Sequence, residues 1–375
     1  MRDLETVISG FREIVQHPEK QVGKYAAEGR KMVGCIPYFY PEELVTACGM
    51  VPIGLWGAEM EVTKAKAYWP AFICSMLQTV LEQGMSGQLD MLSAVIIPLA
   101  CDSMKNMRLN WSCGVPHIPF IDMPMAQNRK LAGGIRYTKT NFRNIQAQLA
   151  EISGKDPKDE EIQAVIALYN KNRAALREFS ALAAKHADVI RPSVRSAVIK
   201  SRYFLAVEEH TAMVEELNSL LEAAPEAKWN GPKIVTTGIM ADSTDLLAIL
   251  DENGYAVVDD QVTQESIYFR EDTPQMDDTV EAMAVRIGNV EGCAVLYDPG
   301  KKRAKMLVDL VKKSGADGVV FVLTKFCDPE EYDYVPVKTA LEDAGIPLLQ
   351  IEADQQMKNY EQARSALEAY KDIIL

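Results

Sequence analysis

The chain has 375 residues, of which 48% are hydrophobic and 25% charged, so it holds enough apolar material for two or three globular domains. Its formal net charge of −13 argues against a general nucleic-acid binder, which needs a basic surface. The first residues lack the apolar core of a secretory signal, and no uncharged run is long enough to cross a bilayer. We therefore expect a cytoplasmic protein that binds neither nucleic acid nor membrane.

The first part of the chain alternates short apolar runs with helical patterns. Apolar side chains at helical spacing predict one or two amphipathic helices within residues 1–30. We predict strands at 31–35, 51–56, 94–101 and 115–121, and helices at 41–49, 71–81 and 104–110. A loop at 36–41 follows the first of these strands. Alternating strands and helices form a parallel sheet, so residues 1–140 are predicted to be N-terminal helices plus a first α/β lobe.

The rest of the chain divides into a helical part and a second alternating part. Residues 141–225 show three apolar stripes at helical spacing and are predicted to be a helical connecting segment. In residues 226–375 we expect strands at 233–239, 255–259, 293–297, 318–324 and 346–351, and helices at 243–252, 276–288, 301–314, 335–344 and 359–374. The predicted fold class is α/β, with two doubly wound parallel-sheet lobes.

Seven cysteines, at positions 35, 48, 74, 101, 113, 293 and 327, show no C-x-x-C spacing, and their odd number argues against a disulfide framework in a cytoplasmic chain. Cys101 and Cys327 each end an apolar run and precede an acidic helix cap, at the strand ends where ligands of open α/β sheets collect. Cys74 lies at or just before a helix start, where the helix N-terminus lowers a thiol pKa.

These cysteines admit two interpretations. A buried cysteine more often serves as a small hydrophobic side chain, and spacing alone does not decide for a shared metal site. If Cys74, Cys101 and Cys327 do share a site, three thiolates suit a cubane iron–sulfur cluster better than zinc and leave one iron open to another ligand. We place Cys48 on a helix, Cys113 in a loop and Cys293 at the start of a buried strand.

Several familiar catalytic motifs are absent from the sequence. There is no G-x-x-x-x-G-K-[ST], G-x-G-x-x-G, H-E-x-x-H or G-x-S-x-G, so no common triphosphate, dinucleotide, zinc-hydrolase or serine-hydrolase site is predicted. The acids that follow Cys327 are explained by a position in the first turn of a helix, and so is the pair Glu42 and Glu43. Neither group requires a catalytic role.

Long stretches of the sequence resemble the 2-hydroxyacyl-CoA dehydratase family, and specifically its smaller, β subunit. The stretch from Gly34 to Gly57 (GCIPYFYPEELVTACGMVPIGLWG) is similar to the opening signature of the family. Later stretches that fit its signatures are Cys101-Asp-Ser, 191–201 (RPSVRSAVIKS), 259–266 (DDQVTQES), 325–331 (KFCDPEE) and 346–352 (IPLLQIE). The resemblance covers essentially the whole chain.

The resemblance implies a heterodimer of related α and β subunits that acts in anaerobic amino-acid fermentation. In such a subunit a [4Fe–4S] cluster is held by three cysteines, which correspond here to Cys74, Cys101 and Cys327. A separate ATP-hydrolysing iron–sulfur activator supplies one electron, and a ketyl radical expels the α-hydroxyl to give an (E)-2-enoyl-CoA. The resemblance further implies that the substrate contacts fall mainly on the larger subunit. The resemblance implies for this chain an electron-relay role, and Glu43 is the one acid marked as a catalytic candidate.

Two other functions remain open from the sequence. The chain could be a subunit of a benzoyl-CoA-reductase-type enzyme, which shares the scaffold but reduces a ring, or a non-catalytic iron–sulfur scaffold. Some relatives also carry a flavin, and the sequence places no flavin site. These alternatives leave the predicted fold unchanged.

Overall fold

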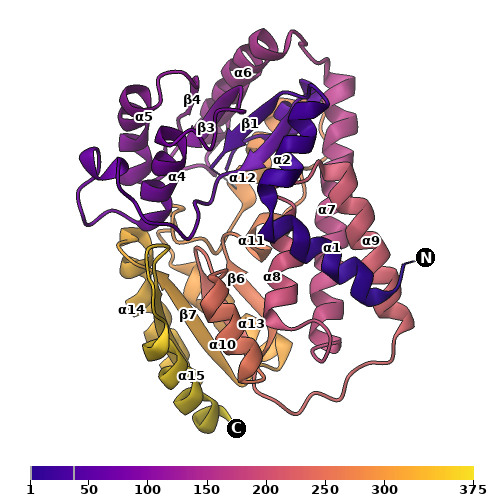
Figure 1. Ribbon diagram of the computed structural model, residues 1–375, viewed down its shortest axis with the longest axis vertical. Coiled ribbons are helices and arrows are strands. Elements are labelled where there is room, and N and C mark those ends of the chain that lie inside the picture. Colours follow the sequence, from indigo (N-terminus) through magenta and orange to yellow (C-terminus); the bar gives the residue numbers. More distant parts are fainter. Residues whose placement is uncertain (1, 37–38) are drawn as a thin grey trace.

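The computed structural model describes residues 2–36 and 39–375, and it contains two four-stranded sheets, both parallel throughout (Figure 1). Helices flank each sheet, so the predicted α/β fold with two lobes is confirmed. Of the loop predicted at 36–41, residues 37–38 lie outside the described residues.

The first sheet has the strand order β2-β1-β3-β4. Its strands are β1 (Met32–Cys35), β2 (Val51–Gly54), β3 (Ala94–Pro98) and β4 (Phe120–Met123). The helices of this lobe are α3 (Glu42–Ala47), α4 (Ser75–Met85) and α5 (Asp102–Gly114), with the short 3₁₀ helix η1 (Ala65–Ala67). β1, β2 and β3 are buried at every position, as expected of a parallel sheet covered on both faces.

The second sheet repeats this order as β6-β5-β7-β8. Its strands are β5 (Lys233–Gly238), β6 (Ala256–Val262), β7 (Gly318–Thr324) and β8 (Leu348–Ala353). Its helices are α10 (Thr244–Glu252), α11 (Ser266–Phe269), α12 (Thr279–Asn289), α13 (Lys302–Ser314), α14 (Asp328–Asp343) and α15 (Glu361–Ile374). In both lobes the order reverses between the first and third strands, which is where doubly wound sheets bind ligands.

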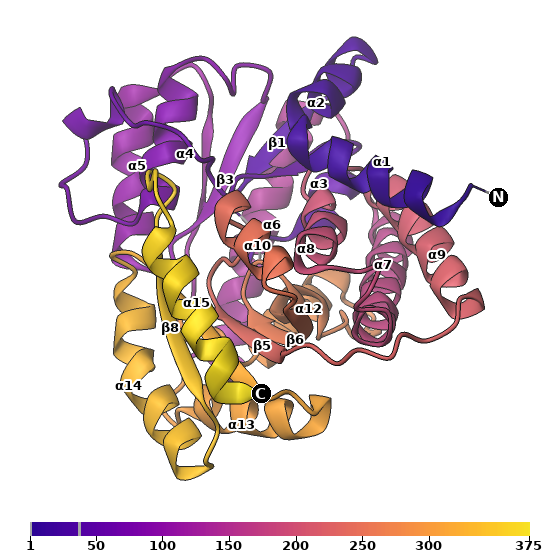
Figure 2. The ribbon, with the colours of Figure 1, turned by 60° about the horizontal axis from the view of Figure 1, so that its bottom comes forward.

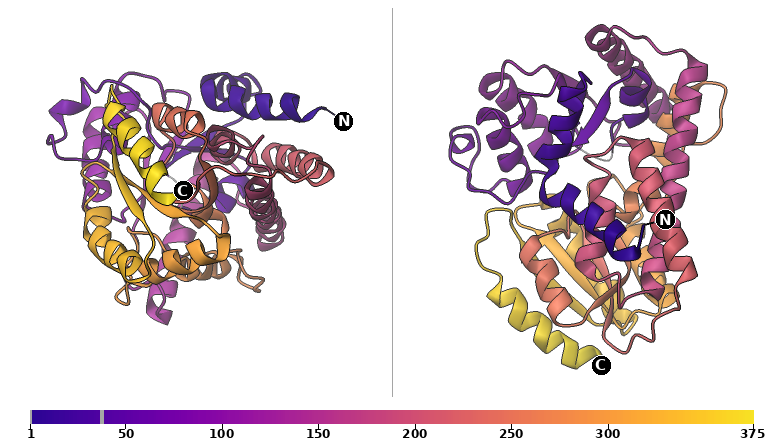
Figure 3. Two further views of the ribbon diagram at one scale, coloured as in Figure 1. Left: turned by 90° about the horizontal axis from the view of Figure 1, so that it is seen from below. Right: turned by 45° about the vertical axis from the view of Figure 1, so that its right-hand side comes forward.

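The remaining helices lie beside the two lobes. They are α1 (Leu4–Gln16), α2 (Pro18–Ala27), α6 (Ala132–Ser153), α7 (Asp159–Lys185), α8 (Pro192–Ser201) and α9 (Val207–Ala223). The long helix α7 packs against α9, and α1 packs against α8 and α9. Figures 2 and 3 show the N-terminal helices in indigo over the side that carries α7, α8 and α9, whereas α15 covers the second lobe.

The strand predicted at 293–297 is wrong. These residues form turns between α12 and α13, so the second sheet has four strands and not five. The apolar run belongs to a buried connection between two helices. Cys293 is 4% exposed, and its thiol accepts a hydrogen bond from Thr263 Oγ1 at 3.2 Å. A short apolar run of this kind does not by itself distinguish a strand from a buried turn.

Other boundaries also differ from the prediction: for example, the strand predicted at 94–101 ends at Pro98, and the helix predicted at 71–81 begins only at Ser75. Cys113 lies in the last turn of α5 and not in a loop. The strand predicted at 115–121 begins only at Phe120, because Pro116 and Pro119 lack the N–H group that a strand needs. The helix predicted at 335–344 begins already at Asp328, directly after Cys327.

Candidate functional site

The two lobes each place a cysteine at the same point of the fold. β3 ends at Pro98 and β7 ends at Thr324, and in each lobe the next helix begins after a cysteine three residues further on. Cys101 is the N-cap residue of α5, and Cys327 is the N-cap residue of α14. The prediction of an acidic cap is therefore wrong, because Asp102 and Asp328 are the first residues of the helices and not their caps. Both follow the third strand of their sheet, so both lie beside the reversal of strand order.

Cys74 joins these two cysteines from a third helix. It is the N-cap residue of α4 and is partly buried, like Cys101 and Cys327. After burial, which is the largest cause, a negative charge on Cys74 or Cys101 would raise the pKa of Cys327, and one on Cys101 would raise the pKa of Cys74. The structure therefore brings the three cysteines within electrostatic reach of one another, with one helix N-terminus behind each of them.

The pKa of each of these thiols is raised and not lowered. Burial raises the pKa of Cys74 to about 12, although the backbone N–H of Leu77 acts in the opposite direction. Burial and the carboxylate of Glu330 raise the pKa of Cys327 well above its ordinary value. The lowering of the Cys74 pKa that we expect from the helix N-terminus is therefore present, but burial of the thiol outweighs it. A bound metal would reverse this balance, since its charge displaces the thiol proton.

The three cysteines do not form a site for a single metal ion. Within the described residues, no three His, Cys, Asp or Glu side chains gather closely enough to hold one. A cubane cluster binds each cysteine through a different iron, so its ligands stand further apart than those of a single zinc ion. Three separated thiols, each at a helix N-terminus that favours negative charge, fit an anionic cluster.

Glu330 fixes the helix that begins at Cys327. Its carboxylate accepts hydrogen bonds from the backbone N–H of Ile239, at 2.7 Å, and of Thr324, at 2.9 Å. These residues lie at the ends of β5 and β7, so the carboxylate spans the point where the strand order reverses. Burial raises the pKa of Glu330 to about 7, against the effect of the Arg303 guanidinium. Glu330 thus anchors α14, and with it Cys327, to the second sheet.

A cavity of about 1010 Å³ lies between the lobes, and we call it the interlobe cavity. Its wall includes Ser75, directly after Cys74, and Thr324, at the end of β7. Other lining residues come from α1, α2, α8 and the segments after β2, β5 and β8. The cavity therefore reaches the residue after Cys74 and the end of the strand that leads to Cys327.

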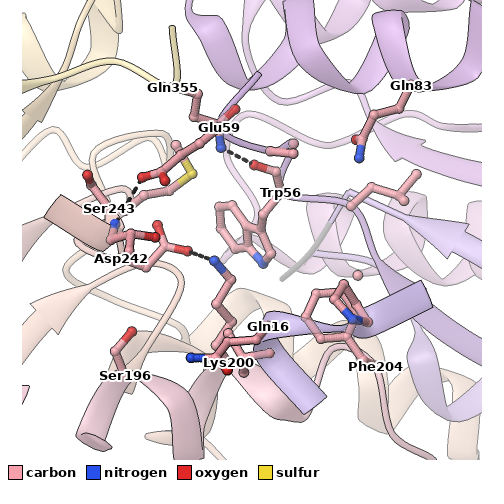
Figure 4. Close-up of a pocket in the computed structure, with 18 of the residues that line it drawn as sticks. Gln16, Trp56, Glu59, Gln83, Ser196, Lys200, Phe204, Asp242, Ser243 and Gln355 are labelled. Carbon is pink, nitrogen blue, oxygen red and sulfur yellow. Dashed lines mark hydrogen bonds and ion pairs between the residues drawn. The ribbon is translucent and has the colours of Figure 1, made fainter. Parts of the chain in front are cut away.

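The interlobe cavity contains an ion pair and aromatic side chains, two of which, Trp56 and Phe204, are labelled in Figure 4. Lys200 Nζ, from α8, lies 2.5 Å from the Asp242 carboxylate, from the segment after β5. Gln264 Nε2 donates to the same carboxylate at 2.9 Å. Trp56 and Phe204 stand on the wall near this pair, so charged and apolar groups face one space.

The segment after β8 connects the two lobes beside the cavity. The Gln355 backbone N–H donates to Ser75 Oγ at 3.0 Å, and its side-chain amide donates to Trp56 O at 2.6 Å. The Thr79 hydroxyl donates to Gln355 Oε1 at 2.7 Å. Gly57, with a positive φ of 74°, leaves room for this approach, because a Cβ there would collide with Thr79 and Gln355. One glutamine thus ties the second lobe to the residue after Cys74.

Glu43, the acid marked from the sequence, lies in a buried ion network and is not among the residues that line the cavity. Its carboxylate lies 2.6 Å from Arg173 and accepts a hydrogen bond from Thr273 Oγ1 at 3.1 Å. Burial raises the pKa of Glu43, but the Arg173 and Arg286 guanidiniums outweigh burial and lower it. The neighbouring Glu42 pairs with Arg202 at 2.9 Å.

Comparisons with known proteins identify the family. The model of the family described as 2-hydroxyglutaryl-CoA dehydratase, D-component, matches residues 37–374. The chain belongs to this family. It is 43% identical to the (R)-phenyllactyl-CoA dehydratase beta subunit of Clostridium sporogenes, over all of both chains. It is 37% identical to the beta subunit of the (R)-2-hydroxyglutaryl-CoA dehydratase of Acidaminococcus fermentans, over 98% of this chain and 99% of that one.

The same comparisons bear on the alternatives. One subunit of the benzoyl-CoA reductase of Thauera aromatica is 23% identical, over 82% of this chain and 81% of its own. The predicted resemblance to dehydratase β subunits is confirmed, and so is the assignment to a lyase. In the described part of this dehydratase-family chain, no helix is long and apolar enough to span a membrane.

Sequence reasoning missed four residues of this dehydratase-family site. Glu330 belongs to a helix start that is acidic for ordinary reasons, and Lys200 lies inside a family signature without a distinctive local pattern. Asp242 and Gln355 lie in connecting segments. Each is brought to its place by contacts between distant parts of the chain, and no spacing in the sequence signals those contacts.

Proposed function

We propose that this chain is the β subunit of an (R)-2-hydroxyacyl-CoA dehydratase, which removes water from its substrate through a ketyl radical and yields an (E)-2-enoyl-CoA. The proposal is supported by the full-length identity to two β subunits of dehydratases. It is carried by one observation, the convergence of three helix-capping cysteines beside a large cavity. The role fits an anaerobic fermentation of amino acids.

We propose Cys74, Cys101 and Cys327 as the ligands of a [4Fe–4S] cluster. When bound, the cluster would relay a single electron, and its fourth iron would take a ligand from outside this set. The N-termini of the surrounding helices would stabilise the negative charge of the cluster, and the burial of the cysteines would exclude water from it. Glu330 holds α14, and thereby Cys327, in place. A flavin in the complete enzyme is a further expectation of the family resemblance, and we assign no residue of this chain to it.

The partners follow from the same proposal. We infer a related α subunit, which carries most of the substrate contacts, and a separate ATP-dependent iron–sulfur activator. Hydrolysis of ATP by another protein is in accord with the lack of a phosphate-binding loop motif in this sequence. The chain thereby acts in electron relay and in assembly of the complex, with the cytoplasm as its expected location.

An anaerobic dehydration assay with and without this chain tests the proposed function. The chain, its α subunit, the activator and ATP are combined anaerobically with a panel of 2-hydroxyacyl-CoA thioesters, and the enoyl-CoA products are measured. We expect product from at least one thioester, and none when this chain is left out. The matched control replaces the panel with benzoyl-CoA. Ring reduction of benzoyl-CoA with no dehydration of any thioester would contradict the proposal and favour the reductase alternative.

A further inference from the structure

The interlobe cavity has a wall chemistry that the relay role does not require. Its apolar lining comes from both lobes and from the N-terminal helices, and includes Val15, Leu55, Trp56, Leu92, Phe204 and Met240. A largely apolar concave site with a few convergent polar groups is typical of small-molecule binding sites. A chain that only relayed electrons would need no such space.

Two of the polar groups at this site form a donor–acceptor pair without net charge. Lys200 supplies an ammonium and Asp242 a carboxylate, 2.5 Å apart, with side-chain exposures of 26% and 12%. Because the two charges cancel, the pair favours a neutral polar ligand over a free carboxylate, which Asp242 would repel. The ammonium can donate to a carbonyl oxygen, and the carboxylate can accept from a hydroxyl.

A carbonyl and a hydroxyl on adjacent carbon atoms are the reactive end of a 2-hydroxyacyl thioester. The apolar walls then face the acyl side chain, and the polar pair faces the carbonyl and the α-hydroxyl. The ionisable lining residues are two basic and four acidic ones, namely Arg12, Lys200, Glu19, Glu59, Asp242 and Asp354. This acidic excess disfavours the phosphates of coenzyme A inside the cavity, so the nucleotide part would lie outside it.

We propose that the interlobe cavity of this chain binds the acyl end of a 2-hydroxyacyl thioester, in addition to the site that we place on the α subunit. Lys200 binds the carbonyl oxygen, and Asp242 accepts the α-hydroxyl proton in a hydrogen bond. The inference rests on the proposed substrate class, but it assigns a binding site to the chain itself. It is a proposal about binding, and no chemical step is attached to it.

Thioester binding to the complex of this chain with its α subunit tests the inference. Without activator and ATP the reaction does not proceed, so (R)-phenyllactyl-CoA and (R)-2-hydroxyglutaryl-CoA serve as probes in anaerobic equilibrium dialysis. We expect two sites per heterodimer for the better probe, and one site after Lys200→Met. Asp242→Asn, which keeps the side-chain shape, should weaken one site about tenfold or more, since a hydrogen bond to a charged group is lost. The matching deoxy thioester, which lacks the α-hydroxyl, should show the same loss at that site.

The control and the contrary results separate this inference from the proposed function. Lys305→Met removes an exposed lysine on α13 and should leave both sites unchanged. If Lys200→Met does not assemble with the α subunit, Asp242→Asn decides the question. Binding that is the same in both cavity variants as in the unmodified complex would overturn the inference alone. If no thioester of the panel binds the unmodified complex, the proposed substrate class itself fails.

Discussion

Replacing Cys327 with serine should abolish iron retention by this chain, with iron falling from about four atoms per chain to almost none. The serine hydroxyl keeps its proton far more tightly than a thiol, so one of three cluster ligands is lost. Cys327 is also the N-cap residue of α14. The hydrogen bonds of Glu330 to the ends of β5 and β7 fix this helix, and thereby the Cys327 thiol, in position. Iron assay and absorption spectra of the anaerobically purified variant measure the effect. The same loss is expected for Cys74→Ser and Cys101→Ser.

Cys293→Ser is the matched control for these variants. Cys293 is also buried, at 4% exposure, and its thiol accepts a hydrogen bond from Thr263, so its loss should cost packing and not iron. The exposed Cys113 provides a second control on α5, the helix that Cys101 caps. Equal iron loss in the Cys293 and Cys327 variants would mean that the ligand set is different from the one proposed.

Replacing Arg173 with methionine should destabilise the protein by about 3–5 kcal/mol, which is the cost of breaking a buried ion pair by removal of one partner. Arg173 is fully buried and lies 2.6 Å from Glu43 and 3.6 Å from Glu42. Without its guanidinium, the buried Glu43 carboxylate loses its closest cation. Urea unfolding of both proteins at neutral pH measures the difference. Adding Glu43→Gln to Arg173→Met should recover part of the loss, and a double variant less stable than the single one would contradict this explanation.

The pH dependence of the same variant has a definite sign. The pKa of Glu43 is lowered in the folded protein, so its ionised form contributes stability that is fully present above its unfolded pKa of 4.5. That contribution is lost as the pH falls through the lower, folded pKa. In Arg173→Met the folded pKa of Glu43 rises, so the stability difference between the two proteins should shrink as the pH falls from this raised pKa through the lower folded pKa of the unmodified protein. A difference that grows on acidification would exclude Glu43 as the source.

The positions of the three cysteines at strand ends and helix starts could be predicted from the sequence, because the patterns that indicate them are local. An apolar run that ends in a cysteine and an acidic residue placed Cys101 and Cys327 after β3 and β7, where the structure has them. Cys74 was placed at a helix start by a local pattern, but only the family resemblance joined it to the other two. The run from 293 to 297 shows the limit of such signals, because burial in a turn and burial in a strand leave the same composition.

The rest of the site depends on contacts that no local pattern encodes. Lys200 meets Asp242 because α8 of the helical segment packs against α10 of the second lobe. Gln355 reaches Ser75 and Trp56 across the two lobes. The pKa of Cys74 shows the same limit. The lowering effect of the helix end can be predicted from the sequence, whereas the burial that outweighs it is a property of the assembled fold.

The metal content of the anaerobically purified chain tests the central claim most directly. We expect about four iron and four acid-labile sulfide atoms per chain, with broad absorption at roughly 400 nm, as is typical of a [4Fe–4S] cluster. On reduction, an electron paramagnetic resonance signal of a reduced cubane should appear. Zinc in place of iron, or a chain that holds no metal after anaerobic preparation, would contradict the assignment of Cys74, Cys101 and Cys327 as cluster ligands.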